Sequence, residues 1–166
     1  MAPLVIELDP LRGAGPVLLG ASHEAAGDAL HSWGVPETYA PYQGALPLDW
    51  RVVGLGVDVV VHCSAGVVET IEIFRDFNVR PSAQVFLLGL DVFSVSAEQV
   101  MAAVVERFEI DDEDAYGFTV PALSVGLGRS IVPNEDSDAE DRDRYTCFDN
   151  ILLAGPGYYD SPAAGK

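Results

Sequence analysis

The sequence predicts an α+β fold made of two helix-plus-β-hairpin repeats, and three observations lead to this prediction. Two segments, 22–34 and 96–108, combine a serine helix cap with an amphipathic spacing. A short apolar run ending in glycine precedes each of them, at 17–20 and 85–89. Segments rich in valine and isoleucine, separated by turn residues, follow each of them. We expect the strands to form one antiparallel sheet with both helices packed on one face.

The clearest helix begins after Ser96. The Ser96 side chain can accept a hydrogen bond from the backbone three residues on, and Gln99 can reach back in a capping-box arrangement. The apolar residues that follow recur at helical spacing and form one stripe: Ala97, Val100, Met101, Val104, Val105 and Phe108. This stripe predicts a helix that packs on the core along one side.

The first half contains the other helix and a hairpin. A strand candidate at 4–6 and a turn-rich stretch come first, and Ser22 then caps a helix that Gly34 ends. Residues 36–50 form a loop with three prolines and three large aromatic residues, Tyr39, Tyr42 and Trp50. Segments 51–63 and 67–74 have strand character and are joined by turn residues, which predicts a β-hairpin.

The second half repeats this order. Residues 76–84 read as a linker, 122–132 as a strand and 145–153 as its return, with an acidic loop at 134–144 between the two strands. The chain of 166 residues is therefore interpreted as a single domain, 1–166, with pseudo-repeats 17–75 and 85–153.

The charge balance limits the classes of partner. Acidic residues number 26 and basic residues 9, and the formal net charge is −17. Five acids lie between 109 and 114 and six between 134 and 144. This charge disfavours nucleic acid and anionic membrane surfaces, and favours a basic protein partner. No apolar run is long enough for a membrane span, and the first residues lack a basic signal-peptide region, so we expect a cytoplasmic protein.

The acidic residues do not match a known metal-binding pattern. Asp136, Asp138 and Glu140 alternate as calcium ligands do, but the sixth and twelfth positions of such a loop hold Asp141 and Cys147 instead of glycine and glutamate. We expect a solvated loop here, and no metal or cofactor, while calcium binding to 134–144 stays open as an alternative.

The histidines and cysteines likewise form no recognised catalytic or zinc motif. His62 and Cys63 are consecutive on a predicted strand, where successive side chains point to opposite faces, so they cannot form a dyad with each other. Cys63 and Cys147 are expected to be buried free thiols, although both lie in strand-like segments and could be neighbours. Gly126 and Gly128 lie in a strand candidate and indicate a bulge or bend.

Residues 19–34 resemble the opening of a known repeat unit. Leu19-Gly20-Ala21-Ser22, a short helix and a terminal Gly34 are similar to the start of tandem helix-plus-hairpin repeats in β-lactamase inhibitory proteins and some toxin-immunity proteins. The second half departs from this pattern, because four extra residues precede its helix lead-in and no glycine follows Phe108. The resemblance implies a binding module and transfers no contact residue.

Function is therefore predicted as a noncatalytic, immunity-like or inhibitor-like module that binds a basic protein. The residues expected to contact the partner are Tyr39, Tyr42, Trp50, Asp136, Asp138 and Glu140. One alternative is a small-molecule-binding protein or enzyme with a pocket between sheet and loops, which a histidine beside a carboxylate in a cavity would favour. A second alternative is a self-association module that pairs exposed strand edges.

Overall fold

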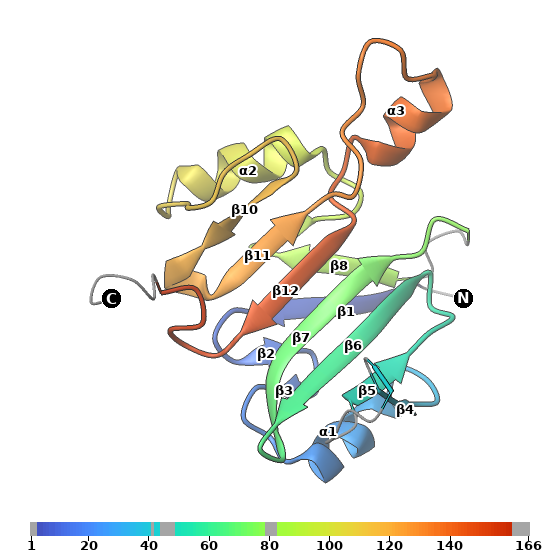
Figure 1. Ribbon diagram of the computed structural model, residues 1–166, viewed down its shortest axis with the longest axis vertical. Coiled ribbons are helices and arrows are strands. Elements are labelled where there is room, and N and C mark those ends of the chain that lie inside the picture. The colour runs from blue at the N-terminus through green and yellow to red at the C-terminus, as the bar shows by residue number, and fades with distance from the viewer. Residues whose placement is uncertain (1–2, 41, 44–48, 79–82, 161–166) are drawn as a thin grey trace.

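The computed structural model describes residues 3–40, 42–43, 49–78 and 83–160, and its strands fall into two sheets (Figure 1). The larger sheet contains, in spatial order, β10 (Gly117–Val120), β11 (Val125–Gly128), β12 (Asn150–Ala154), β7 (Val67–Arg75), β6 (Val57–Ser64), β5 (Asp49–Val52) and β4 (Glu37–Tyr39). The smaller contains β3 (Val17–Leu18), β2 (Gly13–Ala14), β1 (Leu4–Asp9), β8 (Ala83–Leu87) and β9 (Leu90–Asp91). The helices are α1 (His23–Leu30), α2 (Ala97–Val105) and α3 (Ala139–Tyr145), and a 3-10 turn, Pro121–Leu123, joins β10 to β11.

This arrangement is mixed α and β with mostly antiparallel pairing, and the prediction of one sheet is wrong. β1 and β8 pair in parallel, from Leu4 opposite Ala83 to Leu8 opposite Leu87. Parallel strands need a long connection between them, so local turn signals could not reveal this pairing. Residues 85–89, which the sequence matches with 17–20, form the end of β8 and a turn, whereas Val17–Leu18 form the short edge strand β3.

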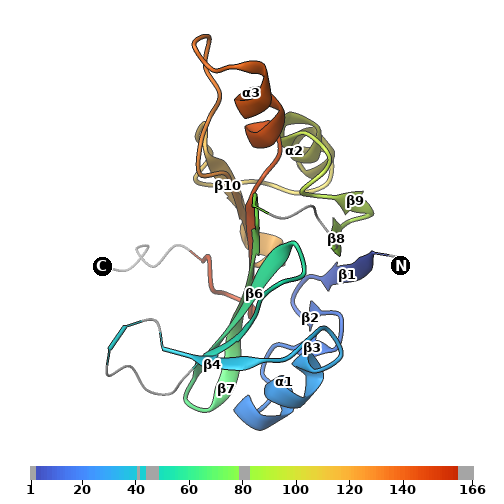
Figure 2. The same cartoon turned by 90° about the vertical axis from the view of Figure 1, so that its right-hand side faces the viewer.

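The core lies between the two sheets because side chains alternate along each strand. Val57, Val59 and Val61 of β6 are buried, as are Ile71 and Ile73 of β7. The smaller sheet and the helices contribute buried residues to the same cluster, including Ile6, Leu8, Val85, Leu87, Leu30 and Val104. Figure 2 shows the smaller sheet on one side of the larger sheet. The opposite face of the larger sheet is therefore not used for the core.

Both predicted helices are confirmed, with differences in detail. The Ser22 hydroxyl accepts a hydrogen bond from the Ala25 backbone at 3.1 Å, and the Ser96 hydroxyl accepts one from the Gln99 backbone at 3.3 Å. The Gln99 side chain reaches back to the Ser96 hydroxyl, which donates to it at 3.1 Å. Val105 is the error in the apolar stripe, because it is 49% exposed on the solvent side of α2.

The first predicted hairpin is confirmed between β6 and β7, with a two-residue turn at Ala65 and Gly66. The predicted strand 51–63, however, is two strands. β5 ends at Val52 and β6 begins at Val57, because Gly54 and Gly56 adopt φ values of +86° and +76° that turn the chain between them.

In the second half the predicted strands begin too early, and β9, β10, the 3-10 turn and α3 were not predicted. Within the predicted strand 122–132 only 125–128 are strand, and the predicted strand 145–153 is replaced by β12, which begins at Asn150 and ends at Ala154. The loop predicted at 134–144 contains α3, which Asp138 caps by accepting from the Asp141 backbone at 2.8 Å. In the predicted linker 76–84, residues 79–82 lie outside the described residues, and Ala83 and Gln84 begin β8.

Candidate functional site

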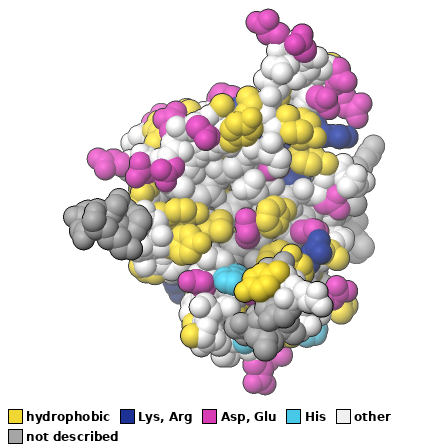
Figure 3. Space-filling view, in the orientation of Figure 1, with side chains coloured by type: hydrophobic (Ala, Val, Ile, Leu, Met, Phe, Trp, Pro, Cys, Tyr) yellow, Lys and Arg dark blue, Asp and Glu magenta, His cyan; other side chains and the backbone are white. Residues whose placement is uncertain are grey.

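The candidate site is the solvent-facing side of the larger sheet, here called the outer face. Its side chains alternate with the core residues and form cross-strand rows, one of which runs through Arg51, Val60, Glu72, Leu152, Gly126 and Thr119. Figure 3 shows hydrophobic side chains across the middle of this face, and acidic side chains mostly around its edges. A broad sheet surface without a covering layer is a typical location for binding.

Two cavities lie next to each other on the outer face and share Glu72 and Leu152. The first, of about 360 Å³, lies over β10, β11 and β12 and is also lined by Asp112, Asp114 and Tyr159. The second, of about 320 Å³, lies over β6 and β7 and includes His62 and Tyr158 among its lining residues. Glu72 therefore stands at the boundary of both.

Glu72 is a half-buried carboxylate at the centre of the outer face. Burial raises the pKa of Glu72, because its ionised form is deprived of water. Among the residues that the structure describes, no hydrogen bond or ion pair reaches this carboxylate. The more deeply buried Asp49 and Asp149, by contrast, each accept several hydrogen bonds.

A tyrosine pair from the C-terminal turn packs against the same face. The rings of Tyr158 and Tyr159 meet edge to face at 5.0 Å. Burial, with smaller contributions from Tyr158 and Glu72, raises the pKa of Tyr159 to about 12. A Cβ atom at Gly126 would lie 2.5 Å from the Tyr159 hydroxyl, so glycine is required there for the ring to pack. Of the bulge or bend predicted at Gly126, the bulge is wrong, because the pairing of β11 with both neighbours is regular.

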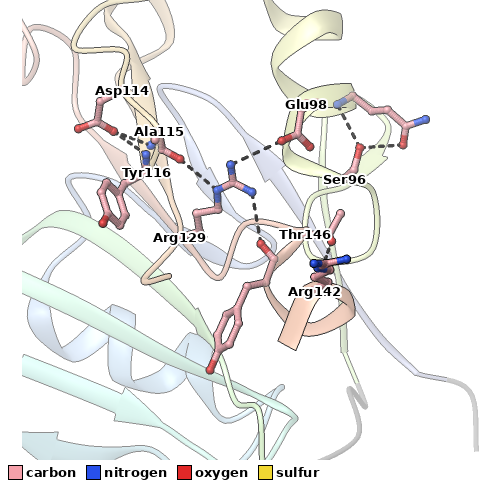
Figure 4. Close-up of polar contacts among 11 residues, drawn as sticks. Ser96, Glu98, Asp114, Ala115, Tyr116, Arg129, Arg142 and Thr146 are labelled. Atoms are coloured by element: carbon pink, nitrogen blue, oxygen red, sulfur yellow. Dashed lines mark hydrogen bonds and ion pairs between the residues drawn. The ribbon is translucent and has the colours of Figure 1, made fainter. Parts of the chain in front are cut away.

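The two arginines next to these cavities already have acidic or carbonyl partners. Arg51 forms an ion pair with Asp58 at 2.7 Å. Arg129, whose side chain is 12% exposed, contacts Glu98 of α2 at 3.5 Å and donates to the carbonyl oxygens of Ala115 and Tyr145 (Figure 4). Arg129 thus ties α2, the loop before β10 and α3 to the edge of the sheet. Neither arginine neutralises Glu72.

One histidine on the outer face bridges two carboxylates. The Nδ1 atom of His62 lies 2.8 Å from Asp49, and its Nε2 atom lies 3.5 Å from Glu69. Asp49 also accepts a hydrogen bond from the Cys63 backbone at 3.1 Å, so its buried position is compensated. Burial and Asp49 raise the pKa of the Cys63 thiol, which faces the core. As predicted, His62 and Cys63 point to opposite faces.

The three aromatic residues predicted to bind a partner have different surroundings. Tyr39 lies on β4 and lines the second cavity, and the Arg51 guanidinium lies 5.8 Å from its ring centre. Tyr42 is 71% exposed. Trp50 packs against α1, stacking on His23 at 4.7 Å and donating from Nε1 to the His23 carbonyl at 2.8 Å. Trp50 is therefore engaged within the fold.

The three predicted acidic contacts lie on or beside α3, away from the cavities. Asp136 is exposed, Asp138 is the helix cap, and Glu140 forms an exposed ion pair with Arg144 at 3.4 Å. Figures 1 and 2 both place α3 and β4 at opposite ends of the molecule. The structure therefore does not bring the predicted acidic and aromatic contacts together.

Other chemistry is limited within the described part of the chain. In that part, no group of three or more histidine, cysteine or acidic side chains could hold a metal ion. Both cysteines are buried and free. None of the described helices has the length and hydrophobicity to cross a bilayer.

Sequence reasoning did not identify Glu72 as a site residue. The signal was present, because Glu72 alternates with Ile71 and Ile73 in a strand and must face away from the core. What the sequence could not show is that the neighbouring strands supply no partner for it. Tyr158 and Tyr159 were recognisable as aromatic residues, but the sequence did not show that they pack against this sheet face.

Comparison with protein-family models, curated proteins and solved structures found no match for this chain. The functional argument therefore rests on the outer face and its chemistry.

Proposed function

We propose that the chain is a noncatalytic protein-binding module, inhibitor-like or immunity-like, whose outer face binds a basic protein. The observation that carries the proposal is a sheet face over which the described residues form no second sheet or helix layer. It has two adjoining cavities, acidic and aromatic side chains, and arginines that already have partners. The net charge of −17 adds a long-range attraction for a basic partner.

The proposal includes an internal duplication with boundaries that differ from those expected from the sequence. Its support is the strand order β10-β11-β12-β7-β6-β5, in which the last strand of each half meets the other at the centre. Ser22 and Ser96, the caps of α1 and α2, also each form an isolated bridge to a later segment, at Val67 and Cys147. The repeats would then begin at β1 and β8. Figure 2 supports packing of α1 and α2 on one side of the larger sheet.

The test is whether one basic protein binds stoichiometrically through the outer face. Affinity capture from the source cells at low salt should recover it, and the purified pair should form a complex that weakens as salt is added. Leu152→Arg, which places a cation on the outer face, should abolish the complex. Val105→Arg changes an exposed residue of α2 and serves as the control. Equal binding by both variants would refute the proposal.

A second candidate is a small-molecule-binding protein or an enzyme, because the second cavity contains His62 beside Asp49. Histidine oriented by a buried carboxylate is a common general base. However, the Nε2 atom that would take a proton faces Glu69 at 3.5 Å, and no serine, threonine or cysteine of the described residues is hydrogen-bonded to it. A screen of small molecules against the wild type and against His62→Gln would test this function. A compound that binds the wild type and not the variant would support it.

A further inference from the structure

The centre of the outer face combines a carboxylate with aromatic and aliphatic walls. Val60 and Leu152 flank Glu72 on the neighbouring strands, and Phe74, 37% exposed, lies two residues along β7. Tyr159 lines the cavity on one side of Glu72, and Tyr158 lines the cavity on the other. A negative group with aromatic side chains near it is suited to a guanidinium or ammonium group, which gains from both ion pairing and cation–π contact.

None of the residues that the structure describes pairs with this carboxylate. Desolvation of a charge costs free energy unless a hydrogen bond or an opposite charge compensates it. The structure gives Asp49 and Asp149 such compensation but shows none for Glu72 among the described residues. A group that is unfavourable in the free protein and lies in a cavity is a candidate for a contact completed on binding.

From this geometry we propose that Glu72 is the anchor point of the outer face, and that it receives one arginine or lysine side chain projecting from the basic partner. The inference rests on the proposed function and specifies which contact holds the partner. Asp112 and Asp114, at the far side of the first cavity, add negative charge along the approach. The partner's side chain would lie over Leu152, with Tyr159 beside it.

Other occupants fit the site less well. A metal ion needs several converging ligands, and Glu72 contributes a single carboxylate in a site where the described residues form no metal-ligand group. A small molecule is usually held in an enclosed cavity that buries most of its surface, whereas these cavities open onto a broad sheet face. A side chain that protrudes from a protein surface needs only a shallow receptor, because the surrounding sheet and rim supply the remaining contacts.

The first experiment needs no knowledge of the partner. Nuclear magnetic resonance titration of the full chain with N-acetyl-arginine methylamide should give saturable shifts at millimolar concentration, centred on residues 70–74 and 150–154. Glu72→Gln should weaken this binding about tenfold, whereas Glu106→Gln, an equal charge change at an exposed site at the end of α2, should leave it unchanged. The uncharged citrulline analogue should not bind. The inference would be overturned if the arginine probe bound Glu72→Gln as tightly as the wild type. Binding of the citrulline analogue as tight as that of the arginine probe would also overturn it.

The second experiment separates this inference from the proposed function. Calorimetric titration with the purified partner should show at least tenfold weaker binding for Glu72→Gln than for Glu106→Gln. If a basic partner binds both variants equally, the anchor is wrong and the proposed function stands. If the arginine probe binds at Glu72 but no stoichiometric partner exists, the proposed function fails and the cation site stands.

Discussion

Gly27 and Trp50 show how single residues fix the position of α1. An ideal Cβ at Gly27 would lie 2.5 Å from the Trp50 ring, and that ring is held by its hydrogen bond to the His23 carbonyl. The sequence marked Trp50 as an exposed anchor, because nothing in its own segment reveals that a glycine on a distant helix makes room for it. A large aromatic residue in a proline-rich loop is thus ambiguous until its neighbours are known.

Gly27→Ala is expected to destabilise the protein, although alanine favours helices by about 1 kcal/mol over glycine. The added methyl group would overlap the Trp50 ring, and overpacking of this kind costs about 1–3 kcal/mol. Urea denaturation should show a lower midpoint for the variant. In a Trp50→Leu background the same substitution should raise the midpoint, and a rise in the wild-type background would contradict the packing argument.

Glu72→Gln is expected to stabilise the free protein at pH 7. Burial raises the pKa of Glu72 above its ordinary 4.5, so the folded state favours the protonated form and loses stability as pH rises through the raised pKa. The melting temperature should increase by roughly 1–3 °C at pH 7, since solvent screens part of the effect. This advantage should shrink as pH falls to 4.5 and below. Glu106→Gln, measured in parallel, should show no such pH-dependent gain.

The helices and strands that could be predicted are those whose sequence signal lies within one short segment. α1 and α2 could be predicted because a capping serine and an apolar stripe lie within a dozen residues. α3 was missed because it has no buried residue, and only its cap and charge order, acids first and arginines last, mark it as a helix. β10 is four residues long and follows an acidic run, which hid its alternating Phe118 and Val120.

The β6–β7 hairpin offers a stabilising change. Ala65 and Gly66 have φ values of +51° and +79°, the pair of positive angles that a type I′ turn requires. Asparagine tolerates this conformation better than alanine, so Ala65→Asn should raise the free energy of unfolding by about 0.5 kcal/mol. Chemical denaturation would measure this gain. The dependence of the unfolding free energy on denaturant concentration should not change. Ala102→Asn, on the exposed side of α2, should have the opposite effect, and a loss at position 65 would refute the turn assignment.

For the molecule as a whole, the dominant property is its charge. Acidic side chains are concentrated on α3 and around the edges of the outer face, and the described arginines near that face are already paired. The remaining negative charges therefore repel one another in the folded chain. Composition was sufficient to predict this property. The two-sheet architecture was not predictable in the same way, because β1 and β8 are separated by more than seventy residues and pair through backbone groups that carry no sequence signature.

Self-repulsion predicts that salt stabilises the free protein. Raising sodium chloride from about 10 mM to about 150 mM shortens the screening length from roughly 30 Å to 8 Å, and should raise the melting temperature by a few degrees. Scanning calorimetry at pH 7 would measure the change. A variant with Asp136→Asn and Asp143→Asn, both exposed in the α3 region, should gain less. A melting temperature that falls with salt would show that the ion pairs outweigh the repulsion.

The glycine positions of β11 also bear on how fast and how selectively a partner could dock. Gly126 and Gly128 leave room for Tyr159 and Asn150 to pack against regularly paired strands, so the floor of the first cavity is already ordered before any encounter. Little conformational entropy would be lost on this side of the complex. Differences in affinity among competing partners would then come mainly from the partners' own surfaces. They would also depend on how well each free partner already orders its cationic side chain.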